Sequence, residues 1–316
     1  MTQEQRTRLQ TWLPLIVLAV LILIVGIYDP RFFSARNFLS VTADTMTLFL
    51  MASGVTLVIM MGGIDLSVQA VASMASCILA AYLQQLGFLA IPLAVLGGAL
   101  AGFIGGLAST KFRIPSFIAT LAVSGVVISA GNWFSQTRSV NIPGDLSATY
   151  LDWAIGEALG VPNEIWVGAA FLVIMSAVLG LTPFGRLVRG IGAQERAVIA
   201  SGINVDRTKI AAFTLSGTMA GVAGVVMAAR LGSGSPTLAN EFLLPAIACI
   251  VVGGTAITGG VGSIWRTFVG ALIVQVVRIG MTFMGVSVFA QQIVFGFILV
   301  AAVAVTMDRA KVLVIK

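Results

Sequence analysis

The chain has 316 residues, of which 58% are hydrophobic and 9% are charged, and its formal net charge is +6. A soluble domain carries about 25% charged residues, so this composition excludes an ordinary soluble protein. Apolar stretches of about 20 residues recur along the whole sequence and predict an all-α polytopic membrane protein, because a β-barrel has short alternating segments instead. Basic residues in such proteins mark cytoplasmic loops, so the positive charge does not indicate a nucleic-acid partner.

The apolar stretches predict about ten membrane-spanning helices in a single transmembrane domain over residues 1–316. No polar stretch is long enough to form a separate soluble domain. The expected spans are 13–28, 40–61, 66–84, 88–109, 115–134, 165–182, 209–231, 244–259, 265–284 and 289–306.

Lysine and arginine predict the orientation, because these residues accumulate in cytoplasmic loops. With both termini in the cytoplasm, the inner side receives Arg6, Arg8, Lys111, Arg113, Arg186, Arg189, Arg196, Arg207, Lys209, Arg266, Arg309, Lys311 and Lys316. The outer side then receives Arg31, Arg36, Arg138 and Arg230. This bias predicts that both termini are cytoplasmic.

The stretch "MMGGIDLSVQ" places a carboxylate and two glycines between the second and third expected spans. A charged residue in mid-membrane costs roughly 2.5–3.5 kcal/mol, and each glycine in a helix interior costs about 1 kcal/mol relative to alanine. We therefore expect a helix break, with Gly62 and Gly63 ending one helix. Asp65 would cap the next helix by accepting hydrogen bonds from the amides of Ser67 and Val68. A solute or gating contact is the alternative, and it is compatible with a cap because broken helices often line a transport path.

Charge expected deep in the membrane is sparse, and the candidates are Asp44, Asp65 and Arg278. A proton- or sodium-coupled carrier usually needs more of them. Asp44 and Arg278 lie toward the outer ends of their spans, where water reaches them. The residues expected at the helix break or along the translocation path are Gly62, Gly63, Asp65, Ser67, Gln69, Asn132 and Arg278.

Residues 135–164 form the expected periplasmic loop between a first half, 1–134, and a second half, 165–316. Five spans in each half would force opposite orientations, so any repeat is inverted, as in many transporters. Within the loop, "LSATYLDWAIGEAL" carries apolar residues on one helical face and predicts a helix on the membrane surface. Glycines four apart, such as Gly98 and Gly102 or Gly217 and Gly221, predict close helix packing within one subunit, with a dimer contact as the alternative.

Residues 183–208 form the longest expected inner loop, and they contain four arginines before Thr208. One short helix is predicted over 193–201, with Gly202 as its stop and Asn204 or Asp206 as the cap of the next span.

Several kinds of catalytic chemistry are missing. The chain has no histidine, no G-x-x-x-x-G-K-[ST] phosphate loop and no G-x-S-x-G motif. We therefore expect no catalytic residues, no metal site and no cofactor in this chain.

The motif "GGIDLS" resembles the signature of the permease subunits of bacterial ABC importers for monosaccharides of the ribose and xylose type. "KFRIPSFIATL", "ASGINVDRTKIAAFTLSGTMAGVAGVVMAARLGSGSPT" and "AIACIVVGGTAITGGVGS" resemble later segments of the same family, in the same order. The chain departs from the usual pattern at Gln69, at Arg266 and over 277–280.

The resemblance implies a non-catalytic subunit that acts as a dimer, of two identical or closely related copies, in the lipid of the bacterial inner membrane. A cytoplasmic ABC ATPase would bind the ATP, and a periplasmic sugar-binding protein would deliver the solute. Residues 193–203 would match the family's coupling helix, which docks on the ATPase; a solvated loop is the alternative. The expected coupling residues are Gln194, Glu195, Arg196, Val198, Ile199, Gly202 and Ile203.

The solute remains open among a pentose or hexose, a polyol, a signalling furanose and a branched-chain amino acid. A ten-span secondary carrier with inverted halves is the alternative from another class.

Overall fold

The computed structural model describes residues 3–306, with side chains for residues 13–304. Among the basic residues that predict the orientation, Arg309, Lys311 and Lys316 lie outside the described residues, as do the side chains of Arg6 and Arg8.

The described chain is built of helices. The long helices are α1 (Gln3–Tyr28), α2 (Ala35–Met60), α3 (Val68–Leu86), α4 (Ala90–Lys111), α5 (Ser116–Ser135), α8 (Asn163–Leu181), α9 (Pro183–Ala200), α10 (Val205–Leu231), α11 (Leu243–Val252), α12 (Ile264–Phe283) and α13 (Val288–Thr306). Short pieces join them: 3-10 helices at Pro30–Phe33, Gly87–Leu89 and Asn240–Phe242, and helices α6 (Gly144–Tyr150) and α7 (Asp152–Ile155). Two antiparallel strand pairs complete the structure: β1 (Val140–Asn141) with β4 (Ser233–Gly234), and β2 (Glu157–Ala158) with β3 (Val161–Pro162).

The predicted all-α membrane protein is confirmed. Six continuous helical stretches are long and apolar enough to cross a membrane, and one of them, Val68–Lys111, contains both α3 and α4. Leu13–Tyr28, Asn240–Val252 and Val288–Ala304 are shorter apolar helices.

The eighth expected span, 244–259, is wrong in length. Its helix α11 covers only Leu243–Val252, because Gly253 and Gly254 follow and Gly254 adopts a φ of +91° that ends the helix. Ten residues rise about 15 Å, roughly half of the hydrocarbon core of a bilayer.

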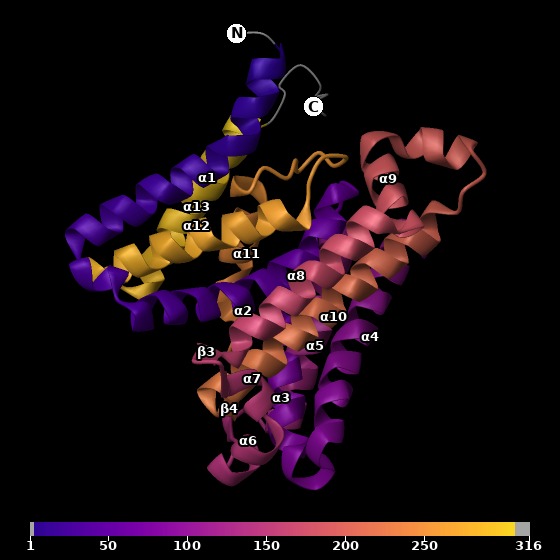
Figure 1. Cartoon of the computed structure of the whole chain (residues 1–316). Coiled ribbons are helices and arrows are strands. Elements are labelled where there is room, and N and C mark those ends of the chain that lie inside the picture. Colours follow the sequence, from indigo (N-terminus) through magenta and orange to yellow (C-terminus); the bar gives the residue numbers. More distant parts are fainter. Residues whose placement is uncertain (1–2, 307–316) are drawn as a thin grey trace.

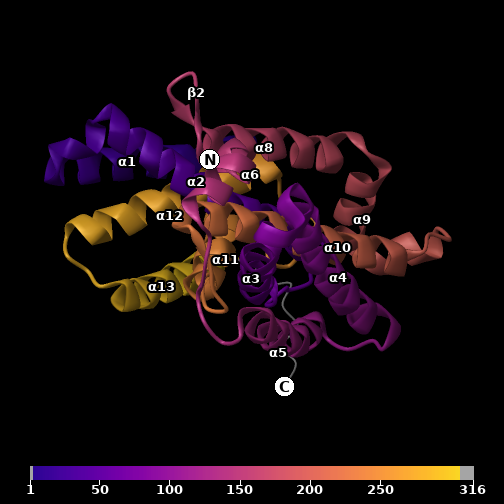
Figure 2. The same ribbon diagram turned by 90° about the horizontal axis from the view of Figure 1, so that it is seen from below.

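Helix α2 forms the centre of the molecule. Of its residues 45–60, every one is buried, and a helix that is apolar all round is typical of a buried position. It packs against α8, α10, α11 and α12. Figures 1 and 2 show α1, α12 and α13 on one side of it and α4, α9 and α10 on the other.

The glycine spacing predicts close helix packing, and the structure confirms it between α4 and α10. A Cβ added at Gly98 would lie 2.4 Å from the Gly217 carbonyl oxygen, and one at Gly217 would lie 2.2 Å from the Gly98 carbonyl oxygen. Such distances are inside van der Waals contact, so the two backbones touch because neither position has a side chain.

The predicted surface helix in residues 135–164 is wrong. The structure has two short helices, α6 and α7, and Gly156 ends the second one before the β2–β3 hairpin. Leu151 and Ala154, expected to face lipid, are fully buried in the core of the chain itself. Since these side chains pack inward, the segment forms a cap over the helices.

Candidate functional site

The predicted break between the second and third spans is present. Helix α2 ends at Met60, Gly62 adopts a φ of +78°, and α3 begins at Val68. The seven residues 61–67 are therefore not helical. The side chain of Gln69, which follows in the first turn of α3, is half-buried.

Asp65 is the polar centre of this break, and it has no exposed surface. Its Oδ1 accepts hydrogen bonds from the Ser67 amide at 3.0 Å and from the Ser67 hydroxyl at 2.7 Å. Its Oδ2 accepts a hydrogen bond of 2.7 Å from the Ser216 hydroxyl on α10. The expected bond from the Val68 amide is absent from the described contacts, so this part of the capping prediction is wrong. Asp65 lies before the N-cap residue Ser67, and it ties the break to α10 instead.

The backbone of the break is satisfied by hydroxyls at the start of α5. The Ile64 amide donates to Ser116 Oγ at 3.0 Å, and the Leu66 amide donates to Thr120 Oγ1 at 3.0 Å. A non-helical backbone can lie among membrane-spanning helices only if neighbouring groups satisfy it in this way.

A glycine junction connects the break to α9 and to the glycine-rich loop after α11. The Gly260 amide donates a hydrogen bond of 2.8 Å to the Met60 carbonyl, at the end of α2. Gly192 of α9 lies against both partners: a Cβ there would be 1.8 Å from the Met60 oxygen and 2.3 Å from the Gly260 nitrogen. The break, the late glycine-rich loop and the beginning of the expected coupling segment therefore meet at one point.

Helix α9 is kinked directly after this junction. Gln194 has non-helical angles, φ −161° and ψ 87°, so the helix consists of two parts that meet there. The second part begins at Glu195, two residues later than the predicted 193, and it ends before Gly202, which adopts the φ of +78° typical of a helix stop. Asn204 caps α10 by accepting from the Arg207 amide, as one of the two alternatives predicted.

The arginine-rich segment 183–208 is more helical than expected. Its first part continues from Pro183, and Val188 and Ile191 on that part are buried against the core. Arg189 turns back and donates to the Leu179 carbonyl at 2.9 Å. The segment is thus held to the spans, and only its last part projects.

The expected coupling residues divide into buried and exposed ones. Val198 packs against the chain's own core, whereas 54% of Ile199 and 39% of Ile203 are exposed. Glu195 forms an ion pair of 2.7 Å with Lys209 on α10. Gln194 and Arg196 are exposed.

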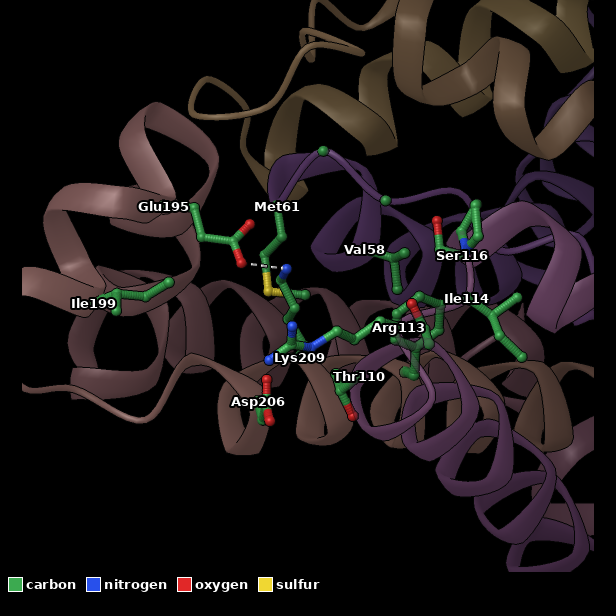
Figure 3. A pocket seen from close by; sticks show the side chains of 15 residues that line it. Val58, Met61, Thr110, Arg113, Ile114, Ser116, Glu195, Ile199, Asp206 and Lys209 are labelled. Atoms are coloured by element: carbon green, nitrogen blue, oxygen red, sulfur yellow. Dashed lines mark hydrogen bonds and ion pairs between the residues drawn. The ribbon is translucent and has the colours of Figure 1, made fainter.

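The break and the coupling segment face one cavity of about 520 Å³ (Figure 3). Glu195 and Ile199 come from α9, and Asp206 and Lys209 come from α10. The remaining lining residues are Val58, Met61, Gly62, Gly63, Ser109, Thr110, Arg113, Ile114, Pro115, Ser116 and Phe213. The second part of α9 and the break therefore line the same cavity.

The other predicted path residues lie elsewhere. Arg278 on α12 lies 5.1 Å from the centre of the Phe242 ring, in a cation–π contact. Asn132 lies near the outer end of α5, in a separate hollow with Tyr82 and Trp133. The structure therefore does not bring the predicted path residues together in one site.

Sequence reasoning missed four residues of this site: Ser216, Gly192, Gly260 and Thr120. Ser216, Gly260 and Thr120 lie inside the segments that carry the family resemblance, so the resemblance is a usable signal for these three. The local spacing of residues gives no signal for any of the four, because the groups that they contact are distant in the sequence.

Residues 37–303 match the family described as "Branched-chain amino acid transport system / permease component". The chain belongs to this family. The ribose import permease protein RbsC of Escherichia coli (strain K12) is 35% identical over 294 residues, which cover 92% of each chain. RbsC of Bacillus subtilis (strain 168) is 36% identical over 303 residues, or 94% of this chain and 92% of the relative. The L-arabinose transport system permease protein AraH of Escherichia coli (strain K12) is 33% identical over 301 residues, or 94% and 90%.

The family membership confirms the predicted class. This member of the family is a permease, the non-catalytic membrane component of a transport system, and it is a multi-pass protein of the inner membrane.

Proposed function

We propose that the chain is the permease subunit of an ATP-driven importer that receives a monosaccharide from a periplasmic binding protein. The observation that carries this proposal is the 35% identity to a ribose import permease over 92% of both chains. The similarity to a permease for L-arabinose favours a sugar over a branched-chain amino acid, although the family description names the latter.

ATP would be bound by a partner ATPase, because the chain contains no phosphate loop of its own. The second part of α9 would dock on that ATPase through Ile199 and Ile203, whose side chains project from an otherwise polar segment. A second copy of the chain, or a close paralogue, completes the proposed complex, on the strength of the resemblance to ribose- and xylose-type permeases.

The proposed topology has ten spans in two inverted halves, with both termini in the cytoplasm. The helix packing supports the repeat: α3 packs against α4 and α5 as α11 packs against α12 and α13, and α4 packs against α10 as α12 packs against α2. The short α11 would then be a half-span completed by its flanking loops. In support of the orientation, α9 and the beginning of α1 lie at one end of the molecule and α6 lies at the other (Figure 1).

A reconstituted system tests the function. Proteoliposomes would contain this chain with the ATPase and binding protein encoded beside it, and radiolabelled ribose, arabinose and fructose would be offered in turn. We expect uptake of at least one sugar that requires both ATP and the binding protein. Uptake by the chain alone, driven by an ion gradient and abolished by an ionophore, would instead identify a secondary carrier.

A further inference from the structure

A second cavity, of about 520 Å³, lies at the opposite end of α2 from the break. It is lined by residues of α2, α10 and α12, and by Leu238 and Phe242 from the loop before α11. The polar lining residues are Asn37, Ser40, Asp44, Thr47, Arg230, Gln275, Arg278 and Thr282. Polar and ionisable side chains from three spans thus converge on one hollow, and in membrane proteins such groups mark solute pathways.

Two charged residues of the lining, Asp44 and Arg230, form an ion-pair network with Glu164, which lies outside the lining. Arg230 of α10 forms ion pairs with Asp44 of α2 and, at 3.1 Å, with Glu164 of α8. The Gln275 amide donates a hydrogen bond of 3.1 Å to the second oxygen of Asp44. Arg230 and Gln275 hold the Asp44 carboxylate in place at the wall of the cavity, with its charge compensated.

Thr47 is the exception among the threonines of α2. Thr42, Thr45 and Thr56 each donate their hydroxyl to the carbonyl four residues earlier. Thr47 is 6% exposed, lines the cavity, and has a hydroxyl with no hydrogen-bond partner among the described residues. Thr255 has the other such hydroxyl in the described chain, but it does not line this cavity. Buried polar groups are nearly always paired. The Thr47 hydroxyl has no accessible surface in this conformation, so a rotation of the side chain toward the cavity would be needed to bring it to a partner outside the chain.

Arg278 offers further donors. Its guanidinium lies over the Phe242 ring and makes no hydrogen bond with the described residues. The two arginines of the lining, Arg230 and Arg278, are balanced by the carboxylates of Asp44 and Glu164, which leaves no excess positive charge to select an anion.

We propose that this outer cavity is a binding site for a neutral, polyhydroxylated solute, held by Thr47, Arg278 and the Asp44–Gln275 pair. Hydroxyl groups both donate and accept, so a sugar can accept from Arg278 while it donates to Asp44 and pairs with Thr47. The volume lies within the range of small-molecule sites. The site rests on the proposed function, for it would receive the sugar at the outer end of the permease.

The test uses the complete transporter in proteoliposomes, with ribose, arabinose and fructose as probes and a saturating amount of the binding protein. The central variant is Thr47→Val, which keeps the shape of the side chain and removes the hydroxyl. We expect ATP-dependent uptake to fall about three- to tenfold, the effect of one hydrogen bond. The thermal midpoint of the variant should stay the same or rise, because an unpaired buried hydroxyl is lost.

Matched variants separate the site from general damage. Thr45→Val is the control, since Thr45 is buried in the same helix, bonds within it and does not line the cavity. Thr47→Ser retains a hydroxyl and should retain most uptake. Arg278→Gln should reduce uptake more than Thr47→Val, because bonds to charged groups are the stronger ones.

The outcomes are distinguishable. If the wild-type complex takes up sugar and both Thr47→Val and Arg278→Gln take it up equally well, the cavity is not a binding site. The proposed function would be unaffected by that result. If the wild-type complex imports none of the three sugars with ATP, the proposed function itself fails, and the sugar site fails with it.

Discussion

The Ser216 hydroxyl of α10 donates a hydrogen bond of 2.7 Å to Asp65 Oδ2, across 151 positions of sequence. The other oxygen of Asp65, Oδ1, accepts hydrogen bonds from the amide and the hydroxyl of Ser67, the N-cap residue of α3. A single buried carboxylate therefore joins the break after α2 to α10, the helix that follows the coupling segment. A displacement of either element would strain the hydrogen bonds to the other.

Asp65→Asn should preserve folding and most transport. The asparagine oxygen can accept both bonds from Ser67, and its amide can donate to the Ser216 hydroxyl, which also accepts. Asp65→Leu would leave these buried donors unpaired, at a cost of about 1–3 kcal/mol in the free energy of unfolding for each. Thermal unfolding in detergent and ATP-dependent uptake measure the two effects. Normal folding with abolished transport in Asp65→Asn would show a direct functional contact and refute the structural role.

Gly192→Ala should disrupt the glycine junction. The added methyl group would lie 1.8 Å from the Met60 oxygen, so the Gly260–Met60 hydrogen bond and the kink of α9 must shift. We expect a lower folded yield or, in the folded fraction, ATP hydrolysis that no longer drives uptake. Gly190→Ala is the matched control, because its Cβ would meet only the Val198 side chain, at 3.4 Å. Equal behaviour of the two variants would argue against the junction.

Ile199→Asp should weaken docking of the ATPase while the permease stays folded, because 54% of Ile199 is exposed. An anchor residue in a small interface costs about 1–2 kcal/mol or more when it is removed. Val198→Asp provides the contrast: it places a charge against the chain's own core and should lower the folded yield. Co-purification of the ATPase and solute-stimulated hydrolysis in nanodiscs are the measurements. Normal assembly and coupling in Ile199→Asp would rule out docking through this residue.

Cysteine labelling tests the orientation. Leu159, 93% exposed in the β2–β3 hairpin, and Phe112, 73% exposed between α4 and α5, are suitable positions. Both native cysteines, Cys77 and Cys249, are fully buried and should not react. In intact cells an impermeant maleimide should label Leu159→Cys only, and Phe112→Cys should require permeabilised cells. The reverse pattern would invert the proposed topology.

The helices, the break and the close packing of small residues can be predicted from the amino-acid sequence alone. These features follow from local rules: a bilayer needs about 20 apolar residues per span, and glycine at a positive φ ends a helix. For the same reason Gly202 and Asn204 mark the boundaries before α10, as their local patterns predict. The expected span 244–259 is too long because it includes Gly253 and Gly254, which lie inside an apolar run but end α11.

The contacts between groups that are distant in the sequence depend on the tertiary fold. Hydropathy assigns a residue to a span, but it does not tell which neighbour that residue faces, because this depends on how the helices pack. Asp65 is predicted to cap its own helix, and it also accepts a hydrogen bond from Ser216. Arg230 is predicted at the outer end of its span, and it pairs with Asp44 and Glu164. The prediction of a surface helix is wrong for the same reason. Leu151 and Ala154 form an apolar face that can pack against lipid or against protein, and in the structure it packs in the core of the chain.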